Sequence, residues 1–342
     1  MRSLLTHIRN DRNGVVLLFT GIILYIVLGF GLGGKFFSVP NFQSMAVQVS
    51  SLGMLSIAMS LAMLSGGIDL SIVSIAALSS IAGAYVMSGQ WIGVTPGNDL
   101  SVTALGVVVV LITATMCGAI NGLLIARCSV PPILATLGTM IFFSGVALAI
   151  TDGQSIAVTA RSLAGLSTST VLDIPVAFVL LLASFVVVGF VLGRRPLGRR
   201  IYLLGDSATT LRFTGARNDR VTFSVYTVSG LLSGLAAVLM LASQNAAREG
   251  FGESYQLQAI LVAVLAGFDP DGGRGRVSNV LIAVAVLQSL QSAFSIMGYS
   301  PFAKNLVWGA LLLVVMVLND VSQRERRQRR RRRLITVNRV TG

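Results

Sequence analysis

Two glycine-rich segments contain the polar residues whose spacing is most informative in this chain. The first covers residues 65–71 and interrupts a long apolar stretch. Gly66 and Gly67 permit a sharp reversal of the backbone, and Asp69 and Ser71 are placed to cap the positive end of the helix that follows. The expected chemistry is hydrogen bonding at a break in a helix, either as a tight turn with a cap or as a gate. The two roles are compatible.

The second glycine-rich segment covers residues 266–276, and its Gly272 and Gly273 predict another break before an apolar helix. It is not a nucleotide site of the P-loop type. That motif needs Gly-x-x-x-x-Gly-Lys-Ser/Thr, and neither Lys35 nor Lys304 lies in that context. We therefore expect the chain itself to bind no ATP in this way, so that its energy must come from an ion gradient or from a partner.

An arginine-rich segment, residues 194–220, is the longest strongly polar stretch in the interior of the chain. Within it, residues 209–213 contain neither glycine nor proline and favour a short helix between glycine hinges. Such a helix suits a rigid docking element, whereas a plain loop would only reflect the preference for positive charge on the cytoplasmic side. The residues alone leave these two interpretations equally open.

Residues suited to catalysis or to metal binding are scarce. The chain has one histidine, His7, and two cysteines, Cys117 and Cys128. So few ligands predict no metal site and no Cys/His pair for nucleophilic catalysis. The apolar runs also contain no conspicuous carboxylate pair, so we set aside a membrane enzyme and expect no catalytic residues and no bound cofactor.

The elements that position these segments follow from the composition. The chain has 342 residues, 54% of them hydrophobic, a mean hydropathy of +0.81, and only 26 basic and 13 acidic side chains. Because a spanning helix needs about 20 mostly apolar residues, the long uncharged runs predict an all-α integral membrane protein. The runs do not alternate as outer-membrane strands do, and disordered, collagen-like, disulfide-rich and soluble classes are excluded. The uncharged runs are residues 13–34, 36–68, 70–98, 100–126, 128–151, 174–193, 221–247 and 277–303.

About ten transmembrane helices are predicted, including short or broken ones. Two segments, 255–268 and 304–318, are shorter than a full span and are expected to be half-helices, tilted ends or re-entrant elements. The predicted spans are roughly 15–32, 43–64, 70–88, 101–125, 133–150, 174–193, 221–243, 255–268, 277–297 and 304–318.

The basic residues orient these helices. With the N-terminus in the cytoplasm, 22 Lys and Arg residues fall inside and four fall outside, as the positive-inside rule requires. We predict that both termini are cytoplasmic, with a leader at 1–14, a membrane domain at 15–318 and an Arg-rich tail at 319–342. The tail carries +7 of the net charge of +13, and we expect a solvated anchor or a contact for membrane lipid rather than a site for nucleic acid.

Six short motifs along nearly the whole chain resemble the inner-membrane permease subunits of bacterial ATP-binding-cassette importers for ribose, xylose, galactose and related compounds. One motif alone would be a weak signal, but six in the order of the family are specific. They are residues 66–71 (Gly-Gly-Ile-Asp-Leu-Ser), 118–124, 130–139, 198–202 with Gly205, Arg212 and Gly215, Tyr226 with 229–235, and 272–275.

The resemblance implies the fold of an ABC importer permease in a bacterial inner membrane. It also implies a core formed with a second permease copy or paralogue, ABC ATPase subunits on the cytoplasmic face, and an extracytoplasmic solute-binding protein. ATP would be bound by the partner subunit. The ATPase-docking loop would then contain Gly198, Arg199, Arg200, Gly205, Arg212 and Gly215, while Gly66, Gly67, Asp69, Ser71, Gly272 and Gly273 form the helix breaks or gate.

Two segments depart from the family pattern. Where relatives tend to have Gly-Gly-Asn and Glu-Ala-Ala-Arg in the docking loop, this chain has Gly-Asp-Ser at 205–207 and Thr-Thr-Leu-Arg at 209–212. This difference predicts that the chain docks to an ATPase subunit specific to it. At residues 268–271, Phe-Asp-Pro-Asp replaces a sequence that is typically small and uncharged.

The poverty of buried charge indicates the kind of solute. Ionisable residues at membrane depth usually mark a transport site, and only Asp69 is a candidate, with a gate or cap role expected. We therefore predict a neutral polar solute, first a monosaccharide, with the furanosyl autoinducer signal or nucleosides as alternatives. An ion-coupled secondary transporter is the weaker hypothesis of another class. Polar side chains suited to such a solute, for which helix packing is the favoured explanation, are Asn121, Thr136, Gln244 and Gln288.

Overall fold

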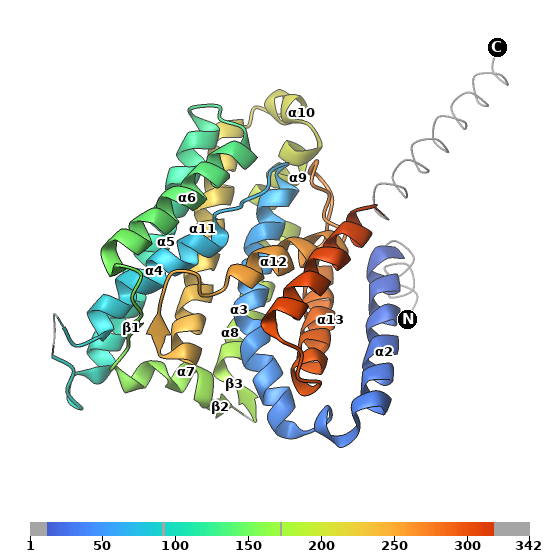
Figure 1. The fold of residues 1–342 in the computed structure, drawn as a ribbon. Helices are drawn as coiled ribbons and strands as arrows, with labels where there is room; N and C mark the ends of the chain where they lie inside the picture. The colour runs from blue at the N-terminus through green and yellow to red at the C-terminus, as the bar shows by residue number, and fades with distance from the viewer. Residues whose placement is uncertain (1–11, 91–92, 172, 318–342) are drawn as a thin grey trace, which may run out of the picture.

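A computed structural model of the chain describes residues 12–90, 93–171 and 173–317 (Figure 1). The predicted tail at 319–342 and residues 1–11 of the predicted leader lie outside the described residues. Within these bounds the chain is a bundle of helices with four two-residue strands, so the predicted all-α membrane architecture is confirmed.

Every predicted span corresponds to a helix. Seven helices in the described part of the chain are long and apolar enough to cross a membrane, whereas α4, α12 and the last helix are shorter. The helices are α2 (Arg12–Leu32), α3 (Val39–Leu64), α4 (Ile72–Met87), α5 (Asp99–Ala126), α6 (Pro132–Thr151), α8 (Val176–Arg194), α11 (Asn218–Gln244), α12 (Glu253–Leu265), α13 (Val277–Ile296) and an unlabelled helix over Pro301–Val317.

The arginine-rich segment between α8 and α11 is also helical. It forms α9 (Pro196–Asp206) and α10 (Ala208–Phe213), which lie together at one end of the bundle (Figure 1). The short helix predicted at 209–213 is therefore present, one residue longer at its start. The sequence analysis did not predict α9, because the arginines and glycines of that stretch are typical of a loop.

The opposite end of the bundle carries short connecting elements (Figure 1). Strands β1 (Ile156–Ala157) and β4 (Ala246–Ala247) pair antiparallel, and β2 (Thr170–Val171) pairs antiparallel with β3 (Ile174–Pro175). The remaining elements are the 3₁₀ turns η1 (Gly33–Lys35) and η2 (Arg161–Leu163) and the one-turn helix α7 (Gly165–Thr168).

The carboxylate of Asp99 connects two segments at this end of the bundle. The side chain of Asp99, in the first turn of α5, accepts hydrogen bonds from the backbone N–H groups of Arg161 and Ser162, each at 2.8 Å. It also accepts a hydrogen bond from the Ser162 hydroxyl. The segment between α6 and α8 is thereby fixed to the start of α5.

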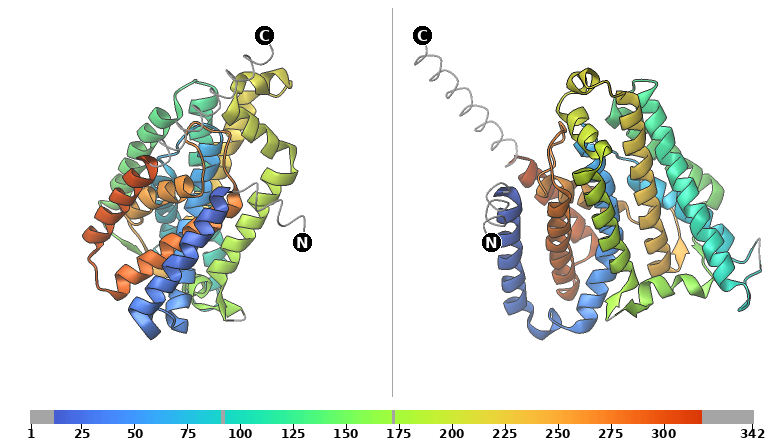
Figure 2. Two further views of the ribbon diagram at one scale, coloured as in Figure 1. Left: turned by 90° about the vertical axis from the view of Figure 1, so that its right-hand side faces the viewer. Right: turned by 180° about the vertical axis from the view of Figure 1, so that it is seen from behind.

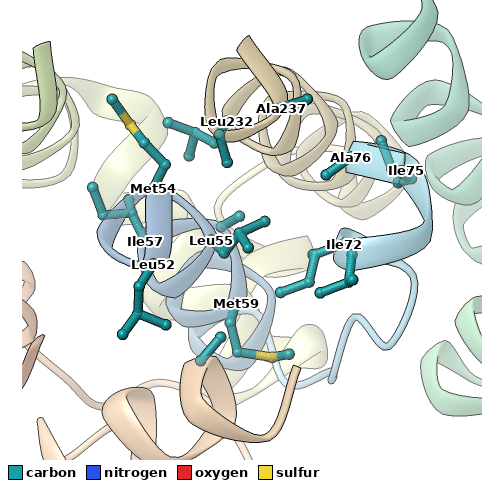
Figure 3. Packing of buried hydrophobic residues seen from close by; sticks show 14 of the residues in the cluster. Leu52, Met54, Leu55, Ile57, Met59, Ile72, Ile75, Ala76, Leu232 and Ala237 are labelled. Atoms are coloured by element: carbon teal, nitrogen blue, oxygen red, sulfur yellow. The ribbon is translucent and has the colours of Figure 1, made fainter. Parts of the chain in front are cut away.

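Helices α3 and α11 form the centre of the bundle. Every residue of α3 from Val49 to Leu64 is buried, and α3 packs against α4, α8, α11, α12 and α13. Figure 3 shows Leu55 of α3 facing Leu232 of α11, with Met59 beside Ile72 of α4. Serine hydroxyls on this buried helix bond back to its own carbonyls, as Ser56 does to Leu52 at 2.7 Å, so they do not remain unpaired in an apolar core.

Helices α5 and α11 approach each other closely because small residues face one another. Ala114, Gly118 and Gly122 are spaced four apart on α5 and lie on one side of it. A Cβ atom on Gly118 would lie 2.7 Å from the Cα of Gly230 on α11 and 2.5 Å from the carbonyl oxygen of Tyr226. Small residues at such spacing are the usual means of tight helix packing in membranes.

This contact predicts a destabilised variant. Replacing Gly118 with leucine forces α5 away from the backbone of α11, and we expect overpacking to cost about 2 kcal/mol or more. Thermal unfolding of the purified chain in detergent measures the loss. The matched control is Gly138→Leu, because a Cβ atom on Gly138 of α6 meets no atom within 4 Å. Equal unfolding temperatures for the two variants would contradict the packing argument.

The two cysteines differ in environment. Cys117 is buried on α5, whereas Cys128 is exposed just beyond the end of that helix. Both thiols are free.

Candidate functional site

The break predicted at residues 65–71 is a partly buried loop between α3 and α4. Asp69 has no exposed surface although it lies outside a helix. Its Oδ1 atom accepts hydrogen bonds from the Ser71 N–H at 3.0 Å and from the Ser71 hydroxyl at 2.6 Å. Its Oδ2 atom accepts from the Ser229 hydroxyl of α11 at 2.9 Å. The carboxylate therefore caps the start of α4 and holds it to α11.

A fourth residue extends this arrangement to α5. The side-chain amide of Asn121 donates to the Ser71 hydroxyl oxygen at 2.7 Å. We call Asp69, Ser71, Asn121 and Ser229 the buried polar cluster, since all four are less than 5% exposed. Ser71, which was predicted to cap α4 with its own side chain, makes no such bond and links Asp69 to Asn121 instead. The cluster joins α4, α5 and α11 at one point.

One polar atom of the cluster and one beside it have no hydrogen-bond partner among the described residues. They are the Asn121 carbonyl oxygen Oδ1 and the hydroxyl of Tyr226, which is 1% exposed on α11. The Tyr226 hydroxyl lies directly against Gly67, where an added Cβ atom would overlap it. Gly67 is thus required for the close approach of this hydroxyl to the loop.

Helix α6 also holds the loop. The hydroxyl of Thr136 donates to the carbonyl oxygen of Ile68 at 3.0 Å. Thr136 and Asn121 thus lie at the break, where packing and hydrogen bonding explain both residues. The other two suggested solute ligands lie elsewhere: Gln288 donates to Gln48 of α3 at 3.2 Å, and Gln244 is exposed at the end of α11.

Three segments that are far apart in the sequence meet at their glycines. The N–H of Gly273 donates to the carbonyl oxygen of Leu64 at 3.0 Å, next to Gly66. A Cβ atom on Gly272 would lie 2.8 Å from the Cα atoms of both Gly66 and Gly205. We call Gly66, Gly205, Gly272 and Gly273 the glycine junction.

At Gly205, Gly272 and Gly273 the junction leaves no room for a side chain. A Cβ atom on Gly205 of α9 would overlap the Leu64 carbonyl oxygen and the Gly273 nitrogen. Gly66 and Gly272 also have positive φ angles, +86° and +95°, which glycine adopts without strain. The two predicted helix breaks and the predicted docking loop are therefore in direct backbone contact.

A tyrosine reinforces this contact. The hydroxyl of Tyr202 on α9 donates to the carbonyl oxygen of Gly275 at 2.8 Å. Burial raises the pKa of Tyr202, although the positive charge of Arg276 opposes the shift, so the phenol keeps the proton that it donates. Helix α9 is thus fixed to the second loop at two positions.

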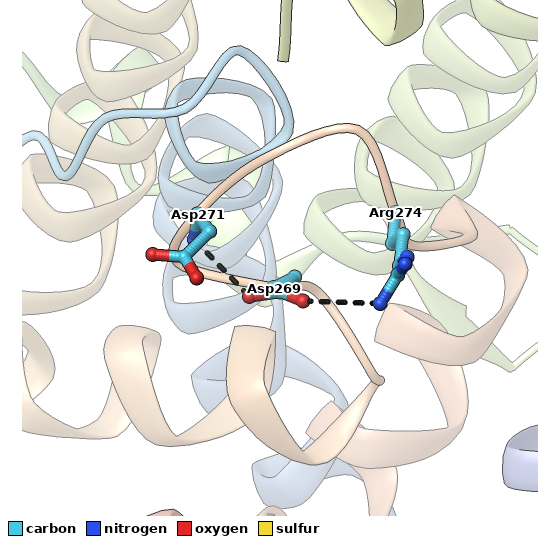
Figure 4. Close-up of polar contacts among 3 residues, drawn as sticks. All are labelled: Asp269, Asp271 and Arg274. Atoms are coloured by element: carbon cyan, nitrogen blue, oxygen red, sulfur yellow. Dashed lines mark hydrogen bonds and ion pairs between the residues drawn. The ribbon is translucent and has the colours of Figure 1, made fainter. Parts of the chain in front are cut away.

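The second loop is a compact turn (Figure 4). The Asp269 carboxylate accepts from the N–H of Asp271 at 3.1 Å and lies 3.7 Å from the guanidinium of Arg274. The carboxylate is 10% exposed and the arginine 68%, so the pair contributes shape more than stability. Phe268 is fully buried behind the turn. The unusual Phe-Asp-Pro-Asp sequence therefore builds the turn that presents Gly272 and Gly273.

The remaining predicted docking residues divide into two groups. Gly198 is buried, and a Cβ atom there would overlap Leu192 of α8. Arg199, Arg200, Arg212 and Gly215 are exposed. Phe213, at the end of α10, is 88% exposed and was not singled out, although a lone phenylalanine among arginines is an available signal.

The structure also reveals polar residues after β4 that the sequence analysis did not single out. Glu249 lies in the connection to α12, and its Oε2 atom is buried with no partner among the described residues. Both side-chain polar atoms of Gln256, on α12, are likewise buried with no partner among the described residues. The signal was present in the sequence as the only Arg-Glu pair followed by glycines within an apolar region.

Comparisons with known proteins identify the family of the chain. A family model described as "Branched-chain amino acid transport system / permease component" matches residues 41–316, which include the buried polar cluster and the glycine junction. The ribose import permease protein of Bacillus subtilis (strain 168) is 33% identical over 88% of this chain and 91% of the relative. No solved structure matches.

Two further relatives carry different names. The L-arabinose transport system permease protein of Escherichia coli (strain K12) is 26% identical over 92% of both chains. The autoinducer 2 import system permease protein of Salmonella paratyphi B is 27% identical over 88% of this chain and 90% of the relative.

Proposed function

Because the chain belongs to the family described as branched-chain amino acid transport system / permease component, we propose that it is the membrane permease subunit of an ATP-binding-cassette importer. It forms the path for a small neutral polar solute, and a monosaccharide is the favoured cargo. A ribose import permease among its relatives supports that cargo, and so does the full use of Asp69 in internal hydrogen bonds.

The glycine junction is the observation that supports the mechanism. In this proposal the chain holds no ATP site and no catalytic residue, and a separate ATPase subunit supplies the energy. ATP binding moves α9 and α10, and the backbone contacts of Gly205 pass that movement to the C-terminal end of α3 and to the turn before α13. The buried polar cluster then sets how far α4 can move against α5 and α11.

The other components follow from this role. We propose a bacterial inner-membrane complex with a second permease copy or paralogue, an ABC ATPase at the arginine-rich end, and a solute-binding protein at the other end. We infer that this end faces the cytoplasm, with both termini on that side, because α9 and α10 lie there and positive-inside counting of the sequence assigns 22 basic residues to the cytoplasm. Autoinducer 2 is the second candidate cargo, favoured by the relative of that name.

The exposed arginines of the docking segment give a direct test. We expect Arg199→Glu with Arg212→Glu to leave the chain in the membrane but to lower ATPase copurification and solute-dependent, vanadate-sensitive ATP hydrolysis. Both side chains are exposed, Arg199 on α9 and Arg212 on α10. Charge reversal at two contacts should weaken the complex by about tenfold or more.

The matched control for this variant is Arg324→Glu with Arg326→Glu, which makes the same change of charge in the tail. We expect that control to retain the ATPase. Normal uptake and normal copurification in the docking variant would refute the assignment. Uptake that follows an ion gradient without any ATPase would favour a secondary transporter.

A further inference from the structure

A basic pocket lies at the arginine-rich end of the α5 and α11 pair, apart from the glycine junction. Its volume is about 370 Å³, and it is lined by the last turn of α5 and the first turns of α11. Leu123 and Phe223 form apolar walls. Arg127, Arg217 and Arg220 line its polar part, with Asp219 as the single acidic residue.

The charged groups of the three pocket arginines have no interaction partner among the described residues. No guanidinium group among them makes an ion pair or hydrogen bond with any described residue, and all three residues are exposed. Asp219 offsets only one of the three charges. A rigid pair of helices thus holds a concentration of positive charge that the chain itself does not neutralise, and the planar donors of arginine suit a phosphate group.

An apolar stripe leads from this pocket along α5. The residues recur every three or four positions on one face of the helix, and their exposed fractions lie between 43% and 61%. Between the first and the last of them the helix is roughly 27 Å long, nearly the thickness of the hydrocarbon core. The stripe is formed by Leu105, Val108, Ile112, Met116, Ile120 and Leu123.

The stripe and the pocket are continuous. Leu123 belongs to both, and a second hollow of about 270 Å³ lies on the same face at Ile112 and Met116. Seven residues separate Met116 from Leu123, which places the hollow roughly 10 Å from the pocket along the helix axis. Figure 2 (right) shows α5 on the outer flank of the bundle beside α11, so this face is open to the surrounding medium.

We propose that the pocket binds the phosphodiester headgroup of an anionic glycerophospholipid, whose acyl chains lie on the α5 stripe. Basic pockets between helices at the cytoplasmic membrane surface are suited to such headgroups. An acidic segment of a protein partner would use the arginines but would leave the stripe and the second hollow unexplained. The lipid would stabilise the close contact of α5 with α11 independently of the transported solute.

Native mass spectrometry of the full chain, titrated with phosphatidylglycerol, tests this site. We expect Arg217→Gln with Arg220→Gln to weaken binding of the first phosphatidylglycerol by about 30-fold. The second variant, Arg127→Gln, removes a single charge from the other helix and should weaken binding by about fivefold. Unchanged thermal unfolding shows that the variants are folded.

The matched control is Arg194→Gln with Arg195→Gln, which removes two exposed arginines from the end of another spanning helix. We expect this control to bind phosphatidylglycerol like the unaltered chain, and phosphatidylcholine to bind weakly to all variants. Equal phosphatidylglycerol binding by the pocket variant and the control would overturn the proposal. Full displacement of the lipid by inorganic phosphate would also overturn it, in favour of a free anion. Loss of ATPase binding with intact lipid binding would show a protein contact instead.

Discussion

Gly205→Ala is expected to lower ATP-driven uptake sharply while the chain still folds and inserts. The added Cβ atom would overlap the Leu64 carbonyl oxygen and the Gly273 nitrogen, so α9 must separate from both helix breaks. Such overpacking costs roughly 1–3 kcal/mol, and we expect the uptake rate to fall by about tenfold or more. Solute uptake by cells that contain the complete importer measures the effect.

A loss of uptake in Gly205→Ala would have the opposite direction to the effect of the substitution on helix stability alone. Within a helix, alanine is more favourable than glycine by up to about 1 kcal/mol, so α9 alone would gain stability from the change. The matched control is Gly193→Ala in α8, where a Cβ atom meets nothing within 4 Å. We expect the control to transport normally. Normal uptake in Gly205→Ala would show that the junction transmits nothing.

Asp69→Ala is expected to give the largest loss of stability. The change leaves the Ser71 N–H and the hydroxyls of Ser71 and Ser229 without their acceptor in a buried site. Each unsatisfied buried donor costs about 1–3 kcal/mol, so we expect a total of about 3 kcal/mol or more. Thermal unfolding in detergent and the yield of folded protein measure this loss.

Two further variants make the Asp69 result specific. Asp69→Asn keeps one acceptor oxygen for Ser71, so we expect a smaller loss, about 1 kcal/mol. Asp271→Ala is the matched control, because Asp271 is an exposed aspartate in the second loop. If Asp69→Ala unfolds at the same temperature as Asp271→Ala, the buried polar cluster is not a stabilising element.

The helices of this fold are predictable because lipid imposes a strong rule on sequence. Each span must hide its backbone in its own hydrogen bonds and present apolar side chains, so charged residues such as Asp69, Asp99 and Arg127 mark the ends of runs. Helix α9 obeys a different rule. It contains Gly198 and Gly205, and glycine weakens a helix. Both positions need glycine because they pack tightly against other backbone segments, and no local sequence pattern indicates this packing.

The site was predictable in its parts but not in its assembly. Asp69 is conspicuous as a carboxylate within an apolar region, and the glycine pairs are conspicuous as breaks. The hydroxyl of Ser229 donates to Asp69, although a serine in a membrane helix usually bonds to its own backbone, so no local pattern predicts this contact. The meeting of Gly66, Gly205 and Gly272 depends on contacts between distant segments, and no spacing in the sequence encodes them.

The two cysteines of the unaltered chain differ in exposure, and this difference allows the orientation of the chain in the membrane to be measured. Cys128 is exposed at the end of α5 beside Arg127, whereas Cys117 is buried within α5. A membrane-impermeant maleimide therefore labels one position, and its reaction in intact cells compared with inverted vesicles reads which face of the membrane holds that end of α5. The same thiol can carry a fluorophore next to the basic pocket without any engineered residue.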